Sequence, residues 1–267
     1  MSIKIFPGPA VRPILFLLWM GTAFTSPAQV EKIKQASNQN SRERSTSGGS
    51  SSSASESIAH GGGGNWGFGA WLVGETIGQM ANWQAHKLRQ RFANPSVVSL
   101  EVMPHLGINP PDYYVAMPRV RGNWGLFSTD FRYNLLLEQA LEGYKSFRTF
   151  DWQILQLNLV TTRPVTLRIG TGFSHESAAR RAFHESTFAL EGRLREDQLG
   201  WGAEYRVSKD YETGAVPRRE FGVRGQYKVW EKGKTRGYLT LGGFLQRYYG
   251  RVNVGGIQGG ITLVINN

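Results

Sequence analysis

Pairs of opposite charges two residues apart are the first candidates for chemistry in this sequence. An acid precedes an arginine by two positions at three places: Asp130–Arg132, Glu191–Arg193 and Glu204–Arg206. In an extended strand, side chains two positions apart project from the same face. Rows of such charges could line a path for an ion or a solute, or could pair with one another and close a narrow interior.

Serine and histidine residues flank one expected loop and form a second candidate. They occur in "SHES" (Ser174 to Ser177) and "HES" (His184 to Ser186). A His–Ser pair supports nucleophilic hydrolysis when an acid orients the histidine. His175 and His184 could share a metal ion, but no third ligand is evident and the chain has no cysteine. We therefore predict no metal site, no cofactor and no enzymatic activity, with a hydrolase at the rim of the fold as an alternative.

The N-terminal segment, residues 1–28, has the features of a cleaved signal peptide. Lys4 and Arg12 precede the apolar run "ILFLLWMGTAF", and "SPA" at 26–28 offers small residues to a signal peptidase. Its removal lowers the formal net charge from +11 to +9, because it contains two bases and no acid. For an exported protein, this charge favours anionic lipid headgroups or surface polysaccharide over nucleic acid as a partner.

Two segments separate this signal from the rest of the chain. Residues 29–64 are rich in Ser and Gly and contain little apolar surface, which predicts a disordered linker. Residues 65–94 have apolar side chains at spacings of three and four and a basic end, which predicts a short amphipathic helix. We expect this helix to pack on the following domain, with a place at a membrane interface as the alternative.

From residue 95 to 267 the apolar residues alternate with polar ones, which predicts an all-β domain. Candidate strands are 9 to 13 residues long, whereas strands of soluble proteins average about 5 to 6. We predict about ten strands, with eight as an alternative: 96–105, 113–121, 125–134, 148–160, 164–174, 182–194, 199–208, 218–230, 236–248 and 253–265. Longer connections at 106–112, 135–147, 175–181 and 209–217 alternate with tight turns, which places the long loops at one end.

Each strand has one apolar and one polar face. In 125–134, Phe127, Phe131 and Tyr133 share the apolar face. The polar faces are rich in glycine and contain charges of both signs, which suits a narrow lumen filled by side chains. The predicted lumen-lining residues are Glu101, Asp130, Arg132, Arg168, Glu191, Arg193, Glu204, Arg206, Arg224 and Lys228.

Alternation alone fits two architectures. A soluble barrel faces its apolar side inward, whereas a membrane barrel faces it toward lipid. Strand length and the charged polar face favour the membrane barrel, and a soluble periplasmic barrel that holds an apolar ligand is the alternative.

The signal, the long amphipathic strands, the long loops at one end and the strand at the C-terminus resemble those of small bacterial outer-membrane β-barrel proteins. The resemblance covers about residues 95–267 and is architectural. It implies an antiparallel up-and-down transmembrane β-barrel in the outer membrane, lipids as partners, and barrel-assembly machinery during biogenesis. That family usually ends in an aromatic residue, whereas this chain ends "ITLVINN".

From these features we expect a non-enzymatic outer-membrane protein with a structural, surface-binding or limited transport role. Ten strands leave little free bore, so we expect the lumen charges to plug the barrel rather than to line a pore. The oligomeric state, and any ligand or solute, stay open at this stage.

Overall fold

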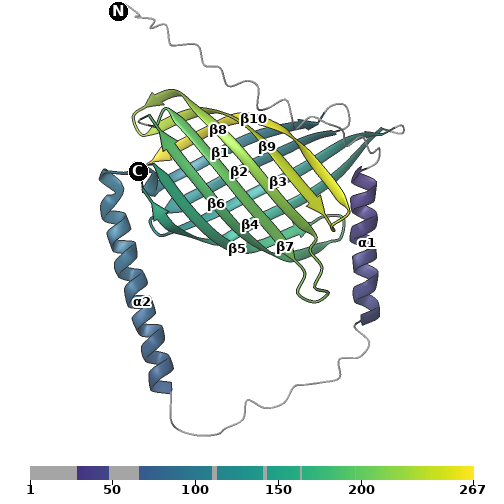
Figure 1. The fold of residues 1–267 in the computed structure, drawn as a ribbon, viewed down its shortest axis with the longest axis horizontal. Helices are drawn as coiled ribbons and strands as arrows, with labels where there is room; N and C mark the ends of the chain where they lie inside the picture. Colours follow the sequence, from purple (N-terminus) through teal and green to yellow (C-terminus); the bar gives the residue numbers. More distant parts are fainter. Residues whose placement is uncertain (1–28, 48–65, 110–112, 141–142, 163, 196) are drawn as a thin grey trace, which may run out of the picture.

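The chain folds into a β-barrel with one helix near each end (Figure 1). The computed structural model describes residues 29–47, 66–109, 113–140, 143–162, 164–195 and 197–267. The predicted signal peptide, and the part of the predicted linker from 48 to 64, lie outside the described residues.

Ten antiparallel strands form the barrel, and each pairs with its neighbours in the sequence. β1 pairs with β10 along a seam that includes Leu100 opposite Ile265 and Val102 opposite Leu263, so the sheet is closed. The prediction of an all-β, up-and-down barrel of ten strands is confirmed, and the alternative of eight is wrong. The strands are β1 (Val98–Asn109), β2 (Tyr113–Trp124), β3 (Phe127–Ala140), β4 (Gly143–Thr161), β5 (Val165–Glu176), β6 (Arg181–Leu194), β7 (Leu199–Lys209), β8 (Arg218–Lys232), β9 (Thr235–Tyr248) and β10 (Val252–Asn266).

The two ends of the barrel differ, and we name them the base and the mouth. The base is the end where β1 begins and β10 finishes, and it also holds the β2–β3 and β8–β9 turns. The mouth is the opposite end, where β1 finishes and β10 begins, and its described connections are 177–180, 210–217 and 249–251.

The predicted long loops at the mouth are mostly wrong. The stretch predicted as the loop 135–147 is instead strand, because β3 continues to Ala140 and β4 starts at Gly143. Pairing of Leu136 with Phe147 and of Glu138 with Lys145 extends this hairpin. Only 210–217 remains a connection of more than four residues at the mouth. Lengthened strands, rather than loops, therefore build this end.

Helix α1 (Gln29–Ser47) occupies a segment predicted to be disordered, so the linker prediction is wrong for residues 29–47. Val30 and Ile33 are fully buried, and Ser37 and Asn40 are nearly so, at the spacing of one helical face. This face lies against the mouth, where it contacts β3, β4 and β10. The local sequence of residues 29–47 does not predict a helix. Contacts with the barrel, rather than the helix propensity of its own residues, stabilise α1.

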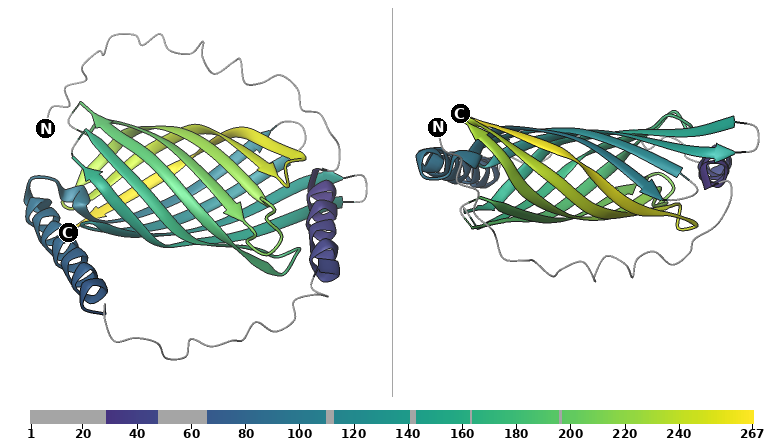
Figure 2. Two further views of the ribbon diagram at one scale, coloured as in Figure 1. Left: turned by 60° about the horizontal axis from the view of Figure 1, so that its bottom comes forward. Right: turned by 90° about the horizontal axis from the view of Figure 1, so that it is seen from above.

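Helix α2 (Trp66–Arg89) falls within the range predicted for an amphipathic helix and lies at the base, opposite α1 (Figures 1 and 2). Its last turns contact the barrel: the Gln84 side chain donates to the Trp124 carbonyl and accepts from the Leu126 amide. Met80 and Trp83, nine and six residues before its end, are exposed. Packing on the barrel is therefore limited, in the described part of α2, to its C-terminal turns.

None of the helices in the described part of the chain combines the length and the apolar character that a membrane-crossing helix requires.

A β-bulge in β4 depends on a glycine in the neighbouring strand. The β4–β5 register shifts between Trp152 and Leu155, and Gly172 of β5 lies opposite this shift. A Cβ atom at Gly172 would lie 2.0 Å from the Trp152 carbonyl oxygen and 2.6 Å from Cα of Gln153. Backbone atoms cannot yield at such distances without deforming the bulge.

We predict that Gly172→Ala lowers the free energy of unfolding by about 1–3 kcal/mol, as overpacking does elsewhere. The matched control is Gly222→Ala, also on an inward strand face, where the nearest atom would be 3.8 Å away. Denaturant unfolding of the refolded barrel measures both. Equal stabilities of the two variants would contradict the role assigned to Gly172.

Candidate functional site

Polar side chains fill the inside of the barrel, and apolar side chains cover its outside. In β9, Thr240 and Gln246 are at most 2% exposed, whereas the intervening Leu241 and Leu245 are at least 50% exposed. In β3, Asp130 is fully buried and Phe131 is 40% exposed. This arrangement is the inverse of that in a soluble barrel, in which apolar side chains face inward.

Fourteen charged side chains inside the barrel form one connected set of ion pairs, which we call the lumen network. It contains seven carboxylates and seven guanidinium groups, so its formal charge is zero. Every cation in it is an arginine, whose planar fork can bind two carboxylates at once. The members are Glu101, Arg119, Arg121, Asp130, Arg132, Asp151, Arg168, Glu185, Glu191, Glu204, Arg206, Arg218, Glu220 and Arg224.

The part of the network nearest the mouth is built around Asp151 of β4. Its carboxylate accepts from Arg132 at 2.8 Å and lies 2.7 Å from a guanidinium nitrogen of Arg218. Arg132 also pairs with Glu220 across the lumen, and Arg218 reaches Glu185 at 2.6 Å. Ser174 donates at 2.7 Å to Asp151 Oδ1, the oxygen that Arg218 also contacts. Side chains from β3, β4, β5, β6 and β8 thus meet in one layer.

Asp130 anchors the middle of the network. It accepts from Arg119 Nε at 2.7 Å and pairs with Arg206 from the opposite part of the wall. Arg119 also binds Glu204 at 2.6 Å, and Arg206 binds Glu185 at 3.0 Å. These contacts join β2 and β3 to β6 and β7 directly across the lumen.

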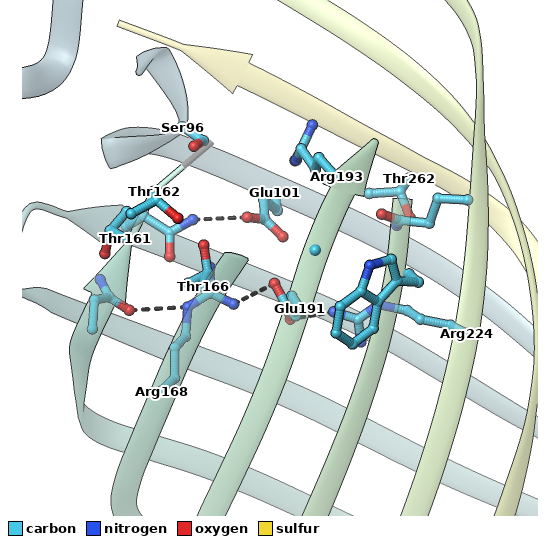
Figure 3. A pocket seen from close by; sticks show the side chains of 15 residues that line it. Ser96, Glu101, Thr161, Thr162, Thr166, Arg168, Glu191, Arg193, Arg224 and Thr262 are labelled. Carbon is cyan, nitrogen blue, oxygen red and sulfur yellow. Dashed lines mark hydrogen bonds and ion pairs between the residues drawn. The ribbon is translucent and has the colours of Figure 1, made fainter. Parts of the chain in front are cut away.

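Glu191 organises the part nearest the base (Figure 3). Its two oxygens accept from Arg168 at 2.5 Å and from Arg224, both drawn in Figure 3, and also from Arg121 at 2.7 Å. Glu101 accepts from Asn123 at 2.8 Å beside the same cluster. Together these groups line a cavity of about 30 Å³, which is room for one or two water molecules. A second cavity of about 40 Å³ lies beside His105, Arg119 and Glu220. Neither is large enough for a solute of metabolite size.

Eight of the ten predicted lumen residues belong to the network: Glu101, Asp130, Arg132, Arg168, Glu191, Glu204, Arg206 and Arg224. Arg193 and Lys228 lie near the base and have other partners. Arg193 donates to the Tyr238 hydroxyl at 2.5 Å, and Lys228 pairs with Glu231 at 2.7 Å.

Sequence reasoning missed six members: Arg119, Arg121, Asp151, Glu185, Arg218 and Glu220. Strand alternation could have predicted most of them. Glu185 is an even number of residues from Glu191 in the same strand, and Glu220 from Arg224, so each pair shares a strand face. Asp151 is different, because the β4 bulge reverses the parity between it and Gln156. The six add three bases and three acids, so the network is neutral because Arg193 and Lys228, two of the six predicted bases, lie outside it.

Of the serine and histidine residues considered for hydrolysis, Ser174 and His175 lie on opposite faces of β5. Ser174 faces inward and donates to Asp151, whereas the neighbouring His175 lies on the outer face of β5. The ring nitrogens of His184 bond to Thr171 at 2.7 Å and to Tyr211 at 3.3 Å. Across the described residues, no three His, Asp or Glu side chains are grouped to hold a metal ion.

No protein-family model matches the chain, and no curated protein sequence resembles it closely enough to count as a match. The geometry of the barrel therefore carries the functional argument.

We predict that Asp130→Asn lowers the free energy of unfolding by about 3–5 kcal/mol, because Arg119 and Arg206 then lose a buried counter-charge. The control is Glu231→Gln, which breaks partly exposed pairs with Lys228 and Arg236 and should cost at most about 1 kcal/mol. Both are measured by denaturant unfolding. A smaller loss for Asp130→Asn than for the control would contradict a cohesive network.

Proposed function

We propose that the chain is an integral outer-membrane β-barrel with a closed lumen, acting as a structural or surface-binding element rather than as an open pore or an enzyme. One observation carries the proposal: the wall is apolar outside and charged inside. Val120, Phe188, Leu239, Leu245 and Ile257 are each at least 40% exposed along it. An apolar wall on this scale is stable in contact with lipid and is an aggregation liability in water.

Exposed aromatic residues lie at both ends of the barrel, and others, such as Phe188 and Tyr205, lie on the wall between them. Near the base, the exposed aromatic side chains are Trp124, Trp201, Tyr227 and Trp230. Near the mouth they are Tyr114, Tyr144 and Tyr211. Membrane barrels have aromatic residues at the two lipid–water interfaces, so the aromatic residues at the two ends support the same proposal.

Helix α2 suits the membrane surface beside the base. Met80 and Trp83 are exposed, as are the basic residues His86 and Arg89 of its last turn, whereas Lys87 is buried. Lys87 lies over the Trp83 ring at 5.8 Å. Exposed apolar side chains next to basic ones favour a helix that lies on anionic lipid headgroups. In this proposal the base faces the periplasm, and delivery there relies on a cleaved signal over residues 1–28.

The proposed role follows from the lumen network. Seven arginines and seven carboxylates pair with one another across the barrel, and the two cavities described beside them have room for only a few water molecules. An open path would require several of these buried pairs to separate at once. Limited transport is therefore the weaker option, and anionic surface polysaccharide and lipids remain the proposed partners.

The first test is the assembly of a variant with a charge on the outer wall. Phe131, which packs edge-on against Phe150, is 40% exposed on the outer face of β3. We predict that Phe131→Arg reduces the heat-modifiable band in the outer-membrane fraction, since an arginine facing lipid near the midplane costs about 2–4 kcal/mol.

Phe131→Leu, which keeps the site apolar, should assemble as the wild type does. Recovery of the wild-type chain in the aqueous periplasmic fraction would reject the proposal and favour a soluble barrel. Hydrolase activity that disappears in both His175→Ala and His184→Ala would favour the rim enzyme.

The second test is electrical. We predict that the purified wild-type barrel in a planar bilayer gives no discrete conductance steps, because the network occupies the lumen. Steady steps from the wild-type barrel that change in size in the Asp130→Asn variant would contradict a closed lumen.

A further inference from the structure

An apolar chamber lies just inside the mouth, beyond the last layer of the lumen network. Val30 and Ile33 of α1 enter it and complete a buried cluster. The barrel contributes nine side chains from β2, β3, β4, β9 and β10: Tyr113, Val115, Met117, Leu136, Phe147, Phe244, Tyr248, Val252 and Val254. The chamber is thus a socket that a short apolar segment fills.

A buried carboxylate receives the first turn of α1 at the edge of this socket. Glu138, 2% exposed, accepts the backbone N–H of Gln29 at 2.6 Å and that of Val30 at 2.8 Å. Free N–H groups at a helix N-terminus attract a negative charge, so this contact sets both the position and the direction of α1.

Further along α1, polar contacts follow the same face. Glu176 accepts from Ser37 at 3.3 Å and from the Tyr249 phenol at 2.6 Å. Burial and the nearby Glu176 carboxylate raise the pKa of Tyr249, so its phenol stays protonated and donates. Thr213 and Arg251, from two mouth connections, bond to Asn40 at 3.4 Å and to Gln39 at 2.7 Å. The mouth therefore binds three features of α1: its apolar side chains, its N-terminal backbone amides and the polar side chains further along the helix.

The route of the chain conflicts with a lipid belt around the barrel. α1 sits at the mouth and α2 sits at the base, and only residues 48–65 join them (Figures 1 and 2). Eighteen residues reach roughly 60 Å, which is enough to pass the hydrocarbon core of about 30 Å. However, this stretch has six glycines, six serines and one large apolar residue, Ile58. Such a composition cannot cross lipid, and the lumen network fills the only other route.

On the basis of the proposed membrane location, we propose that the mouth is a peptide-binding site whose ligand is an apolar helix N-terminus of the kind that α1 presents. In a chain surrounded by lipid, α1 remains on the base side and the socket faces the outside without it. A peptide supplied from the outside then takes the place that α1 occupies in the structure.

The test uses disulfide capture, since the chain has no cysteine of its own. Asn40 and Thr213 are in side-chain contact, so a cysteine at each position reports docking. A peptide of residues 29–47 with Asn40→Cys is added, under mild oxidation, to intact cells that display the Thr213→Cys full-length barrel. We expect capture of the peptide. The same barrel with a second, internal Asn40→Cys change should form no internal disulfide in the membrane.

Two peptide variants separate specific docking from loose association. Ile33→Asp places a charge where a fully buried side chain enters the socket and should abolish capture. Gln35→Ala changes an exposed position of α1 and should leave capture unchanged. Absence of capture of the parent peptide, or equal capture of the Ile33→Asp peptide, would overturn the binding site.

An internal disulfide in the membrane-embedded double variant would overturn the exclusion of α1. Heat-modifiable migration and fractionation of the same samples report the membrane location independently. Failure of the proposed function, seen as recovery in the aqueous fraction, is thereby distinguished from failure of peptide binding, seen as an assembled barrel that captures nothing.

Discussion

Charge neutrality inside the barrel is the constraint on which the rest of the structure depends. A buried carboxylate or guanidinium without a partner costs several kcal/mol, so ten strands can close around charges only if the charges cancel. Seven arginines and seven carboxylates meet this condition, and several of them bridge opposite walls, as Arg119 does to Glu204. The network therefore fixes the register of strands that are not neighbours in the sheet. Hydrogen bonds between adjacent strands close the cylinder, and ion pairs across its axis hold its cross-section.

A charged interior in turn determines the character of the wall. Because alternate side chains on each strand face the network, the others must face out, and a strand with charges on both faces would suit neither lipid nor lumen. The outward residues of β9 and β10, such as Leu241 and Ile261, are accordingly large and apolar. Small residues offset the bulk of the arginines: at Gly202, an added Cβ would lie 3.3 Å from the Arg224 side chain. The apolar outer wall and the narrow lumen filled with side chains thus follow from the same alternation of residues along each strand.

Strand period alone predicted the ten strands, the barrel and the facing of residues such as Asp130 and Phe131, because one-residue alternation is a strictly local signal. What it missed depends on distant contacts. The β4 bulge reverses parity and hides Asp151, and no local pattern announces it. At the mouth, β3 extends to Ala140 because it pairs with β4 as far as Gly143. Helix α1 has few apolar residues of its own, and it depends on Glu138, more than a hundred positions away, to bind its first turn.

Carboxylates at different depths along the barrel axis have different kinds of hydrogen-bond donor. This difference distinguishes contacts that are permanent from contacts that can be exchanged. Deep in the lumen, Asp130 and Glu191 are held by arginines of the barrel itself, which cannot leave without unfolding it. At the mouth, Glu138 and Glu176 accept instead from backbone amides and hydroxyls, including those of α1. Neutral donors can be exchanged for water or for another peptide at a small net free-energy cost, whereas loss of an arginine from the lumen leaves a buried charge. The barrel thus has a fixed interior and one replaceable face, and that face is the mouth.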